Sequence, residues 1–243
     1  MANESGRVLV TGGSGDIGTA ICTALARDGW RVIVHANANR ERAGAVASAI
    51  REAGGNAEVA AFDLTDAAAT RAAIEGLLQA GPVHALVHNA GIHDDAPLAG
   101  MSEDQWRRVI DVSLHGFFHV TQPLLLPMAR ARFGRIVAVS SVAATLGNRG
   151  QVNYAAAKSA LHGAAKSLAR EMASRNITVN VVAPGIIEGR STDTLFSPEQ
   201  VKAMIPAART GAPAEVAAVV AFLCSNAASY VNGQVIGVNG GMA

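Results

Sequence analysis

A tyrosine and a lysine stand four residues apart at Tyr154 and Lys158, and Ser141 lies thirteen residues before the tyrosine. The surrounding positions are rich in alanine, which favours helix, so the phenol and the ammonium should share one helix face. A neighbouring cation favours phenolate and can bring a phenol, whose ordinary pKa is about 10, into the range for proton transfer. The Ser141 hydroxyl could hold a substrate oxygen beside them. These residues predict a proton-transfer site, although a tyrosine and a lysine at this spacing also occur as a helix flank and a solvated charge.

Length and composition describe a chain that can bury a large core. Half of the 243 residues are hydrophobic and 16% are charged, which favours one domain over residues 1–243. The net charge of +1 argues against a broad nucleic-acid surface, and we find neither a signal-like start nor the run of about 20 apolar residues that spans a membrane. Cys22 and Cys224 stand apart in apolar contexts, so we expect two buried free thiols, no metal site and a cytoplasmic protein.

Short apolar runs alternate with helix-like segments. Most runs are apolar throughout, which is typical of strands covered on both faces; they are 8–10, 32–34, 57–62, 85–87, 136–139, 177–182 and 234–238. The helix-like segments are 17–28, 40–53, 66–80, 103–131, 153–174 and 213–224. This alternation predicts an α/β fold with a doubly wound, Rossmann-type sheet of seven parallel strands, helices on both faces, and a ligand crevice at the carboxyl ends of the strands.

Two stretches are less regular. Pro123 and Pro127 should bend or interrupt the segment 103–131, because proline lacks the amide hydrogen that a helix interior needs. The stretch 187–210 has weak periodicity and contains glycine and proline. We expect it to form a substrate lid over the crevice, with one short helix at 198–204.

A glycine-rich turn joins the first strand to the first helix at residues 11–18. Glycines let the backbone approach a pyrophosphate, whose charge suits the free amides and the positive end of the following helix. We expect a dinucleotide here, although such a turn can also occur without a cofactor. The residues expected to contact the cofactor are Gly12, Ser14, Gly15, Asp16, Ile17 and Gly18.

The end of the second strand should lie beside the adenosine ribose. An acidic residue there would bind the 2′-hydroxyl and repel a 2′-phosphate. The sequence instead offers Asn37, Asn39 and Arg40, with Arg42 shortly after, which favours NADPH over NADH, although Arg40 could be only a solvated charge. After the third strand, Asp63 and its neighbour Leu64 could contact the adenine; an acid at this point can also be a helix cap.

Asn89, Ala90 and Gly91 follow the fourth strand. Small residues there let the backbone pass close to a ligand. Asn89 could fix the turn by bonding neighbouring backbone groups. We therefore expect these three residues in the cofactor site.

The motifs together resemble the short-chain dehydrogenases/reductases over essentially the whole chain, in the order Thr11-Gly12, Asn89-Ala90-Gly91, Ser141, Tyr154-xxx-Lys158, Pro184-Gly185 and Val238-Asn239-Gly240-Gly241. Residues 151–158, 167–171, 177–185 and 233–242 are most similar to the 3-oxoacyl-[acyl-carrier-protein] reductases of that family. The resemblance implies NADPH-dependent reduction of a 3-oxoacyl thioester to the 3-hydroxyacyl form, in fatty-acid or specialised acyl or polyene biosynthesis, usually by a homotetramer.

The resemblance also implies a role for each residue. Ser141 would position and polarise the ketone oxygen, and Tyr154 would deliver the proton. Lys158 would lower the pKa of the tyrosine and hold the nicotinamide ribose, while Ser140 would point away from the site. The residues expected against the nicotinamide are Pro184, Gly185 and Ile187.

The chain departs from the family pattern at several positions. A carboxylate facing a pyrophosphate would be repelled, so we expect Asp16, where a glycine is usual, to turn away and cap the following helix. Ser113 replaces an asparagine whose backbone carbonyl is taken to hold a water leading to the lysine. Because every residue has a carbonyl, we expect Ser113 to serve as the fourth catalytic residue. Gly189 and Arg190 replace a usual Thr and Asp, which hints at an atypical acyl substrate or an altered lid.

The expected partner is an acyl carrier protein, with no nucleic acid or membrane. Relatives contact this acidic protein through basic side chains near the active-site entrance; the matching positions are Arg132 and Arg175, which could also be ordinary surface charges. Two other functions stay open. One is a reductase or dehydrogenase of a small free ketone or alcohol; the other is a catalytically silent nucleotide-binding subunit, against which the retained Tyr154 and Lys158 argue.

Overall fold

The apolar runs of the sequence form one parallel sheet in the computed structural model, which describes residues 6–189 and 196–243. Within those ranges the sheet has seven strands in the order β3-β2-β1-β4-β5-β6-β7. The strands are β1 (Arg7–Thr11), β2 (Arg31–Ala36), β3 (Asn56–Ala61), β4 (Ala85–His88), β5 (Gly134–Val139), β6 (Ile177–Pro184) and β7 (Val235–Val238). The predicted doubly wound α/β fold is confirmed.

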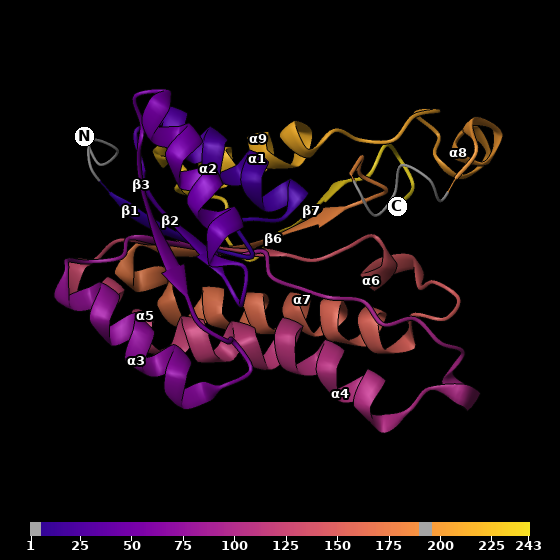
Figure 1. The fold of residues 1–243 in the computed structure, drawn as a ribbon, viewed down its shortest axis with the longest axis horizontal. Helices are drawn as coiled ribbons and strands as arrows, with labels where there is room; N and C mark the ends of the chain where they lie inside the picture. Colours follow the sequence, from indigo (N-terminus) through magenta and orange to yellow (C-terminus); the bar gives the residue numbers. More distant parts are fainter. Residues whose placement is uncertain (1–5, 190–195) are drawn as a thin grey trace.

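Helices cover both faces of the sheet (Figure 1). One layer holds α1 (Asp16–Arg27), α2 (Arg40–Glu52) and α9 (Pro213–Cys224). The other holds α3 (Ala67–Gln79), α5 (Gly116–Ala131) and α7 (Val152–Met172), with α4 (Glu103–Ile110) at its end. Val8 and Val10 of β1 join the core of the first layer while Leu9 joins that of the second, because successive strand side chains point to opposite faces.

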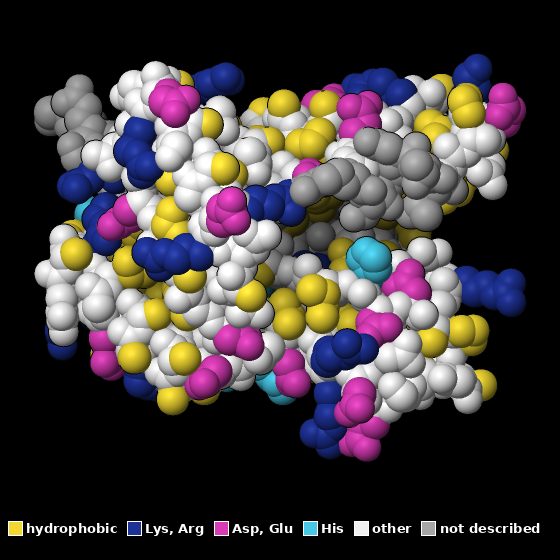
Figure 2. Space-filling view, in the orientation of Figure 1, with side chains coloured by type: hydrophobic (Ala, Val, Ile, Leu, Met, Phe, Trp, Pro, Cys, Tyr) yellow, Lys and Arg dark blue, Asp and Glu magenta, His cyan; other side chains and the backbone are white. Residues whose placement is uncertain are grey.

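The sheet places a crevice at its centre. Strand β1 pairs with β2 on one side and β4 on the other, so the chain winds outward from β1 in both directions. The loops that follow β1 and β4 therefore separate at the carboxyl ends of these strands, where doubly wound folds bind ligands. A space-filling view shows the surface hollowed between the two layers (Figure 2).

The long predicted helix 103–131 is divided, but not by its prolines. Helix α4 ends at Ile110, a π-helical turn follows at Asp111–His115, and α5 then continues through Pro123 and Pro127. A π-turn shifts the hydrogen-bond register by one residue, and such turns often mark functional sites. The expected interruption at the prolines is wrong, and the irregularity lies beside Ser113 instead.

The predicted lid is partly described. Ile187 forms an isolated parallel bridge with Gly211, and α8 (Pro198–Met204) begins at the capping residue Ser197. The short helix expected at 198–204 is thus confirmed. Arg190 lies outside the described residues, and closure of a lid stays a prediction. The short helix α6 (Ala143–Leu146) follows β5 and was not predicted.

Cys22 and Cys224 are buried free thiols, as expected. Burial raises the pKa of both, that of Cys224 to about 12. Among the residues that the structure describes, no group of His, Cys, Asp and Glu side chains could hold a metal ion. None of the described helices is long and apolar enough to cross a bilayer.

Candidate active site

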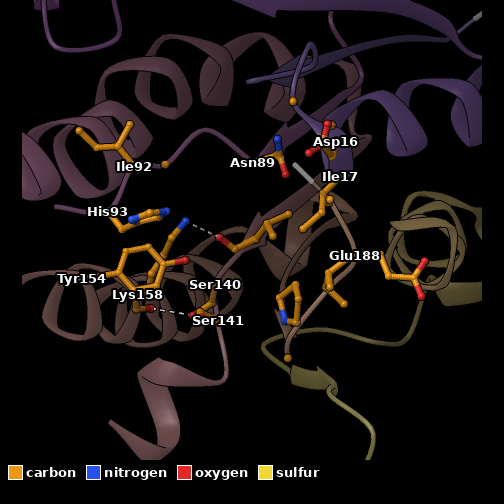
Figure 3. A pocket seen from close by; sticks show the side chains of 18 residues that line it. Asp16, Ile17, Asn89, Ile92, His93, Ser140, Ser141, Tyr154, Lys158 and Glu188 are labelled. Carbon is orange, nitrogen blue, oxygen red and sulfur yellow. Dashed lines mark hydrogen bonds between the residues drawn. The ribbon is translucent and has the colours of Figure 1, made fainter. Parts of the chain in front are cut away.

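Ser141, Tyr154 and Lys158 lie in the wall of one cavity of about 360 Å³ (Figure 3). Ser141 follows the end of β5, and α7 carries the tyrosine and the lysine one turn apart. The cavity opens at the carboxyl ends of the strands, so the predicted grouping is present in the fold.

Lys158 is buried and already has a backbone partner. Its Nζ donates a hydrogen bond to the carbonyl of Val139, at 2.8 Å. Burial lowers the pKa of the ammonium to about 8, so at neutral pH the side chain is still mainly charged. A Cβ at Gly91 would stand 2.8 Å from Nζ, which shows how closely the glycine backbone passes the ammonium.

The pKa of Tyr154 is shifted in the direction opposite to expectation. Burial raises the pKa of the phenol, the negative charge of Asp95 adds to this, and the Ser141 hydroxyl partly offsets it. The Lys158 Nζ is held at the Val139 carbonyl and lies 5.8 Å from the centre of the tyrosine ring. Tyr154 therefore stays protonated at neutral pH, in the form that can donate a proton.

The two adjacent serines face different surroundings. The backbone N–H of Ala143 donates to Ser141 Oγ at 3.2 Å, which leaves the Ser141 hydroxyl hydrogen available to another acceptor. Ser140 Oγ instead donates to the Lys158 carbonyl at 3.0 Å and lies 2.8 Å from His162 Nε2. The side-chain contacts of Ser140 are thus with α7, although the residue also contributes to the cavity wall.

The glycine-rich turn is held tightly against β2. The Gly12 N–H donates to His35 Nδ1 at 3.2 Å, and the Gly13 N–H donates to the His35 carbonyl at 2.9 Å. Gly12 has a φ of +61°, a conformation that favours glycine. A Cβ at Gly18 would stand only 2.1 Å from the Gly12 carbonyl oxygen, so no larger residue fits at this position of α1.

Asp16 does not cap α1, so that expectation is wrong. The N-cap is Gly15, which has no side chain to cap with, and Asp16 is the first helical residue. Its carboxylate lies 3.4 Å from the Arg42 guanidinium and contributes to the cavity wall. An acid in the first turn interacts favourably with the helix dipole, which is a sufficient local reason for its position.

A second cavity, of about 310 Å³, continues from the first and shares Gly15, Asn89, Gly91 and Ile92 with it. Asn37 lines this cavity, but the expected Asn39 and Arg40 do not. The side chain of Asn39 caps α2 by accepting from the Arg42 N–H at 2.9 Å. Of the two arginines that follow β2, Arg42 lines the cavity and Arg40 does not. Other lining residues are Gly12, Ser14, Asp63, Leu64 and Ala90.

Asp63 does not cap a helix, which was the alternative to its role beside the adenine. It accepts from the N–H and the hydroxyl of Thr65, each at 2.8 Å, while Asp66 caps α3. The side chain of Asn89 donates to the carbonyls of Thr11 (3.2 Å) and Gly12 (3.0 Å), and so ties the turn after β4 to the turn after β1. The expectation that Asn89 bonds backbone groups is confirmed.

The other side of the first cavity is formed by residues that follow β6. Pro184, Gly185 and Ile187 line it, and Glu188, which follows them, lies across the cavity from Tyr154 and Lys158 (Figure 3). A Cβ at Gly185 would stand 2.8 Å from the Cα of Asn239, so the glycine allows the segment after β7 to pack against this wall.

Ser113 is fully buried in the π-turn. Its carbonyl lies 2.9 Å from Nε2 of His88, the last residue of β4. The ring of His88 is buried as well, and burial lowers its pKa to about 3, so it is neutral. This histidine was not singled out in the sequence, because its partners lie far from it along the chain.

Arg132 and Arg175 do not lie near the entrance, so that expectation is wrong for a single chain. Arg132 ends α5 two residues before β5, and Arg175 precedes β6 by two residues. The cavities lie at the opposite, carboxyl ends of these strands. An eight-residue strand such as β6 is about 26 Å long, so the amino ends of the strands lie far from the cavities at their carboxyl ends.

His93 is a cavity residue that the sequence did not indicate. Its side chain is 62% exposed, and its ring meets that of Tyr154 edge to face with centroids 6.4 Å apart. The residue follows the Asn89-Ala90-Gly91 turn by two positions, which is the one signal that could have found it. Glu188, just after the bridge at Ile187, also lines the cavity.

The two cavities fit a dinucleotide. They form a continuous path from the Arg42 and Asp63 end, past the amides at the start of α1, to Tyr154 and Pro184. The close approaches at Gly12, Gly18 and Gly91 bring the turns after β1 and β4, the start of α1 and Lys158 together along this path.

Comparisons with known proteins agree with this geometry. A family model described as Enoyl-(Acyl carrier protein) reductase matches residues 13–243. The chain is 44% identical to the 3-oxoacyl-[acyl-carrier-protein] reductase FabG of Aggregatibacter actinomycetemcomitans over 237 residues, which cover 97% of this chain and 98% of the relative. Identity is 44% to FabG of Staphylococcus aureus strain Mu50 (96% of each chain) and 42% to FabG of Escherichia coli K12 (99% and 98%). The chain therefore belongs to the short-chain dehydrogenase/reductase family.

Proposed function

We propose that this protein reduces the ketone of a 3-oxoacyl thioester, carried by an acyl carrier protein, to the 3-hydroxyacyl form with NADPH. The observation that carries the proposal is the convergence of Ser141, Tyr154 and Lys158 in a cavity that continues to the glycine-rich turn. Identity of 42–44% over nearly the full length to three FabG reductases supports the same reaction. We place this reaction in fatty-acid biosynthesis.

The protein residues manage the proton and the ketone oxygen. The Ser141 hydroxyl, already accepting from Ala143, has its hydrogen left to donate to the ketone oxygen. Tyr154, which the raised pKa keeps protonated, is the acid that protonates the same oxygen as negative charge develops there. Protonated tyrosine is the form that reduction requires, whereas the reverse oxidation would require phenolate.

A nicotinamide cofactor, which this family uses, supplies the hydride when bound. We assign Pro184, Gly185 and Ile187 to its nicotinamide side and Lys158 to its ribose. At the other end, Arg42 lines the cavity beside Asn37, and no acidic residue follows β2 at the position that would repel a 2′-phosphate. These features favour NADPH over NADH.

We further propose that the enzyme works as a homotetramer with acyl carrier protein as its partner. Arg132 and Arg175 lie at the amino ends of the strands, away from the cavity of their own chain. If the carrier protein docks on them, it would deliver its substrate to the active site of a neighbouring copy in the tetramer. Reversing both charges should then raise the KM for carrier-bound substrate and leave that for a small thioester unchanged.

The reaction can be tested by following the absorbance of reduced nicotinamide. We expect rapid NADPH oxidation with a 3-oxoacyl thioester, faster on the carrier protein than on coenzyme A, and a much lower rate with NADH. Parallel reactions under the same conditions replace the 3-oxoacyl thioester with a 2-enoyl thioester or with a small free ketone. Because the family model is described by an enoyl reduction, a preference for the enoyl thioester would refute the proposed substrate, and a preference for the free ketone would favour the alternative reductase.

A further inference from the structure

The two polar groups of Ser113 have different surroundings. Its backbone carbonyl is engaged by His88 at 2.9 Å. Its hydroxyl is fully buried and has no hydrogen-bond partner among the described residues. A buried hydroxyl without a partner is costly, so each one in a native fold calls for an explanation.

Hydrogen bonds on the other side of His88 fix which of its nitrogens carries the hydrogen. Thr11 Oγ1 accepts from the N–H groups of Asn89 and Ala90, each at 3.1 Å. Its own hydrogen is therefore left for His88 Nδ1, at 3.3 Å, which must act as the acceptor. Nε2 of the neutral ring then carries the hydrogen and donates it to the Ser113 carbonyl. The hydrogen bonds from the Thr11 hydroxyl through His88 to the Ser113 carbonyl therefore all run in one direction, and they hold the π-turn against β4.

The Ser113 hydroxyl and the Lys158 ammonium flank the same glycine. A Cβ at Gly91 would stand 2.8 Å from Lys158 Nζ and 3.5 Å from Ser113 Oγ. The two atoms are therefore at most about 6.3 Å apart, a span that a single bridging water with hydrogen bonds of up to about 3.2 Å to each partner can cover. The geometry thus brings an acceptor without a partner close to a buried cation.

We propose that the hydroxyl of Ser113, and not its backbone carbonyl, supports the charged Lys158 ammonium through one bridging water, with His88 as the residue that positions the π-turn. Ser113 is then a positioning residue for the lysine of the proposed reductase. The inference rests on the proposed function only for its kinetic readout.

The expected effect has a definite sign. A hydrogen-bond acceptor favours the charged form of the lysine and raises its pKa, against burial, which lowers it. The other titratable groups around the ammonium are Tyr154 of α7, His88 of β4, His93 after β4, and Asp16 and Glu188 in the same cavity wall. None of them is changed by a substitution at Ser113, so a shift in the pKa of Lys158 reports the hydroxyl.

The test compares Ser113→Ala and Ser113→Cys, which remove the strong acceptor, with Ser113→Thr, which keeps it. The matched control is Thr178→Val, which removes another buried hydroxyl without a partner in the described chain, at the amino end of β6 and so away from the cavity. The full chain is assayed in two ways. One is the pH profile of kcat at saturating NADPH with a 3-oxoacyl thioester. The other, which needs no substrate, is the pH dependence of Lys158 acetylation by acetic anhydride, read by mass spectrometry.

We expect Ser113→Ala and Ser113→Cys to lower kcat about tenfold, which is the lower end for losing a hydrogen bond to a charge. The basic limb of the pH profile and the midpoint of acetylation should both move down by about one pH unit. Ser113→Thr should keep both at their original positions in whatever activity it retains, and Thr178→Val should change neither.

Unchanged midpoints in Ser113→Ala would overturn the inference in favour of the carbonyl, and so would a downward shift in Ser113→Thr. Thermal melts show whether each variant is folded; should Ser113→Ala fail to fold, Ser113→Cys gives the same reading with the volume preserved. If the unmodified protein reduces no 3-oxoacyl thioester, the proposed function fails, while the acetylation midpoints still decide the role of Ser113.

Discussion

Acid should destabilise this protein through its two buried histidines, His35 and His88. Both rings are neutral in the fold, because burial lowers the pKa of His35 to about 4 and that of His88 to about 3. In each ring Nδ1 is an acceptor, from Gly12 N–H in His35 and from the Thr11 hydroxyl in His88, so a proton at Nδ1 would break a bond that holds a turn of the cofactor site.

The magnitude follows from proton linkage. The folded pKa values lie below the ordinary value of about 6.5, so the unfolded chain binds more protons as the pH falls. The stability from neutral histidines is complete above about pH 6.5 and is lost as the pH falls towards the folded values. Each proton contributes about 1.4 kcal/mol per pH unit, so two protons over about two units, down to pH 4.5, remove about 5 kcal/mol. That loss is comparable with the whole stability of many domains.

The assay is urea unfolding at a series of pH values between about 6.5 and 4.5. We expect the free energy of unfolding to fall with a slope of at least two protons, since the half-buried His84 and His162 shift in the same direction. His35→Gln should reduce the slope by about one proton, and His115→Gln serves as the control for losing an exposed histidine. A slope of one proton or less in the unmodified protein would refute the reasoning.

Three further predictions concern the site. Gly18→Ala should weaken NADPH binding at least tenfold, about 1.4 kcal/mol, because its Cβ meets the Gly12 carbonyl at 2.1 Å. Gly76→Ala is the matched control, because a Cβ at this α3 position meets no atom within 4 Å and the residue lies outside both cavities; both variants are read by fluorescence titration. Tyr154→Phe should lower kcat by about 10²–10⁴ while cofactor affinity in the same titration stays within about twofold; a smaller loss of kcat would remove the tyrosine as the acid. Arg42→Ala should raise the KM for NADPH about tenfold and leave that for NADH unchanged, and an equal rise for both cofactors, or a larger effect of Arg40→Ala, would contradict the assignment of the 2′-phosphate site.

Local sequence patterns were sufficient to predict much of the fold and the position of the site. Continuous apolar runs predicted strands buried on both faces, and their alternation with helical segments predicted the parallel sheet and the position of its crevice. The spacing of Tyr154 and Lys158 placed them on one helix face, and the glycines of residues 11–18 marked the turn. These features depend on residues close in sequence, where spacing alone fixes geometry.

The tertiary structure decided what lies around those residues. The lysine ammonium contacts the carbonyl of Val139 rather than the tyrosine hydroxyl, and burial therefore sets the direction of the tyrosine pKa. Arg42, and not Arg40, lines the cavity, while Asn39 caps α2. Arg132 lies at the amino end of β5, away from the cavities at the carboxyl ends of the strands. The electrostatics of a buried group depend on partners brought from distant parts of the chain, and the spacing of residues along the sequence does not contain that information.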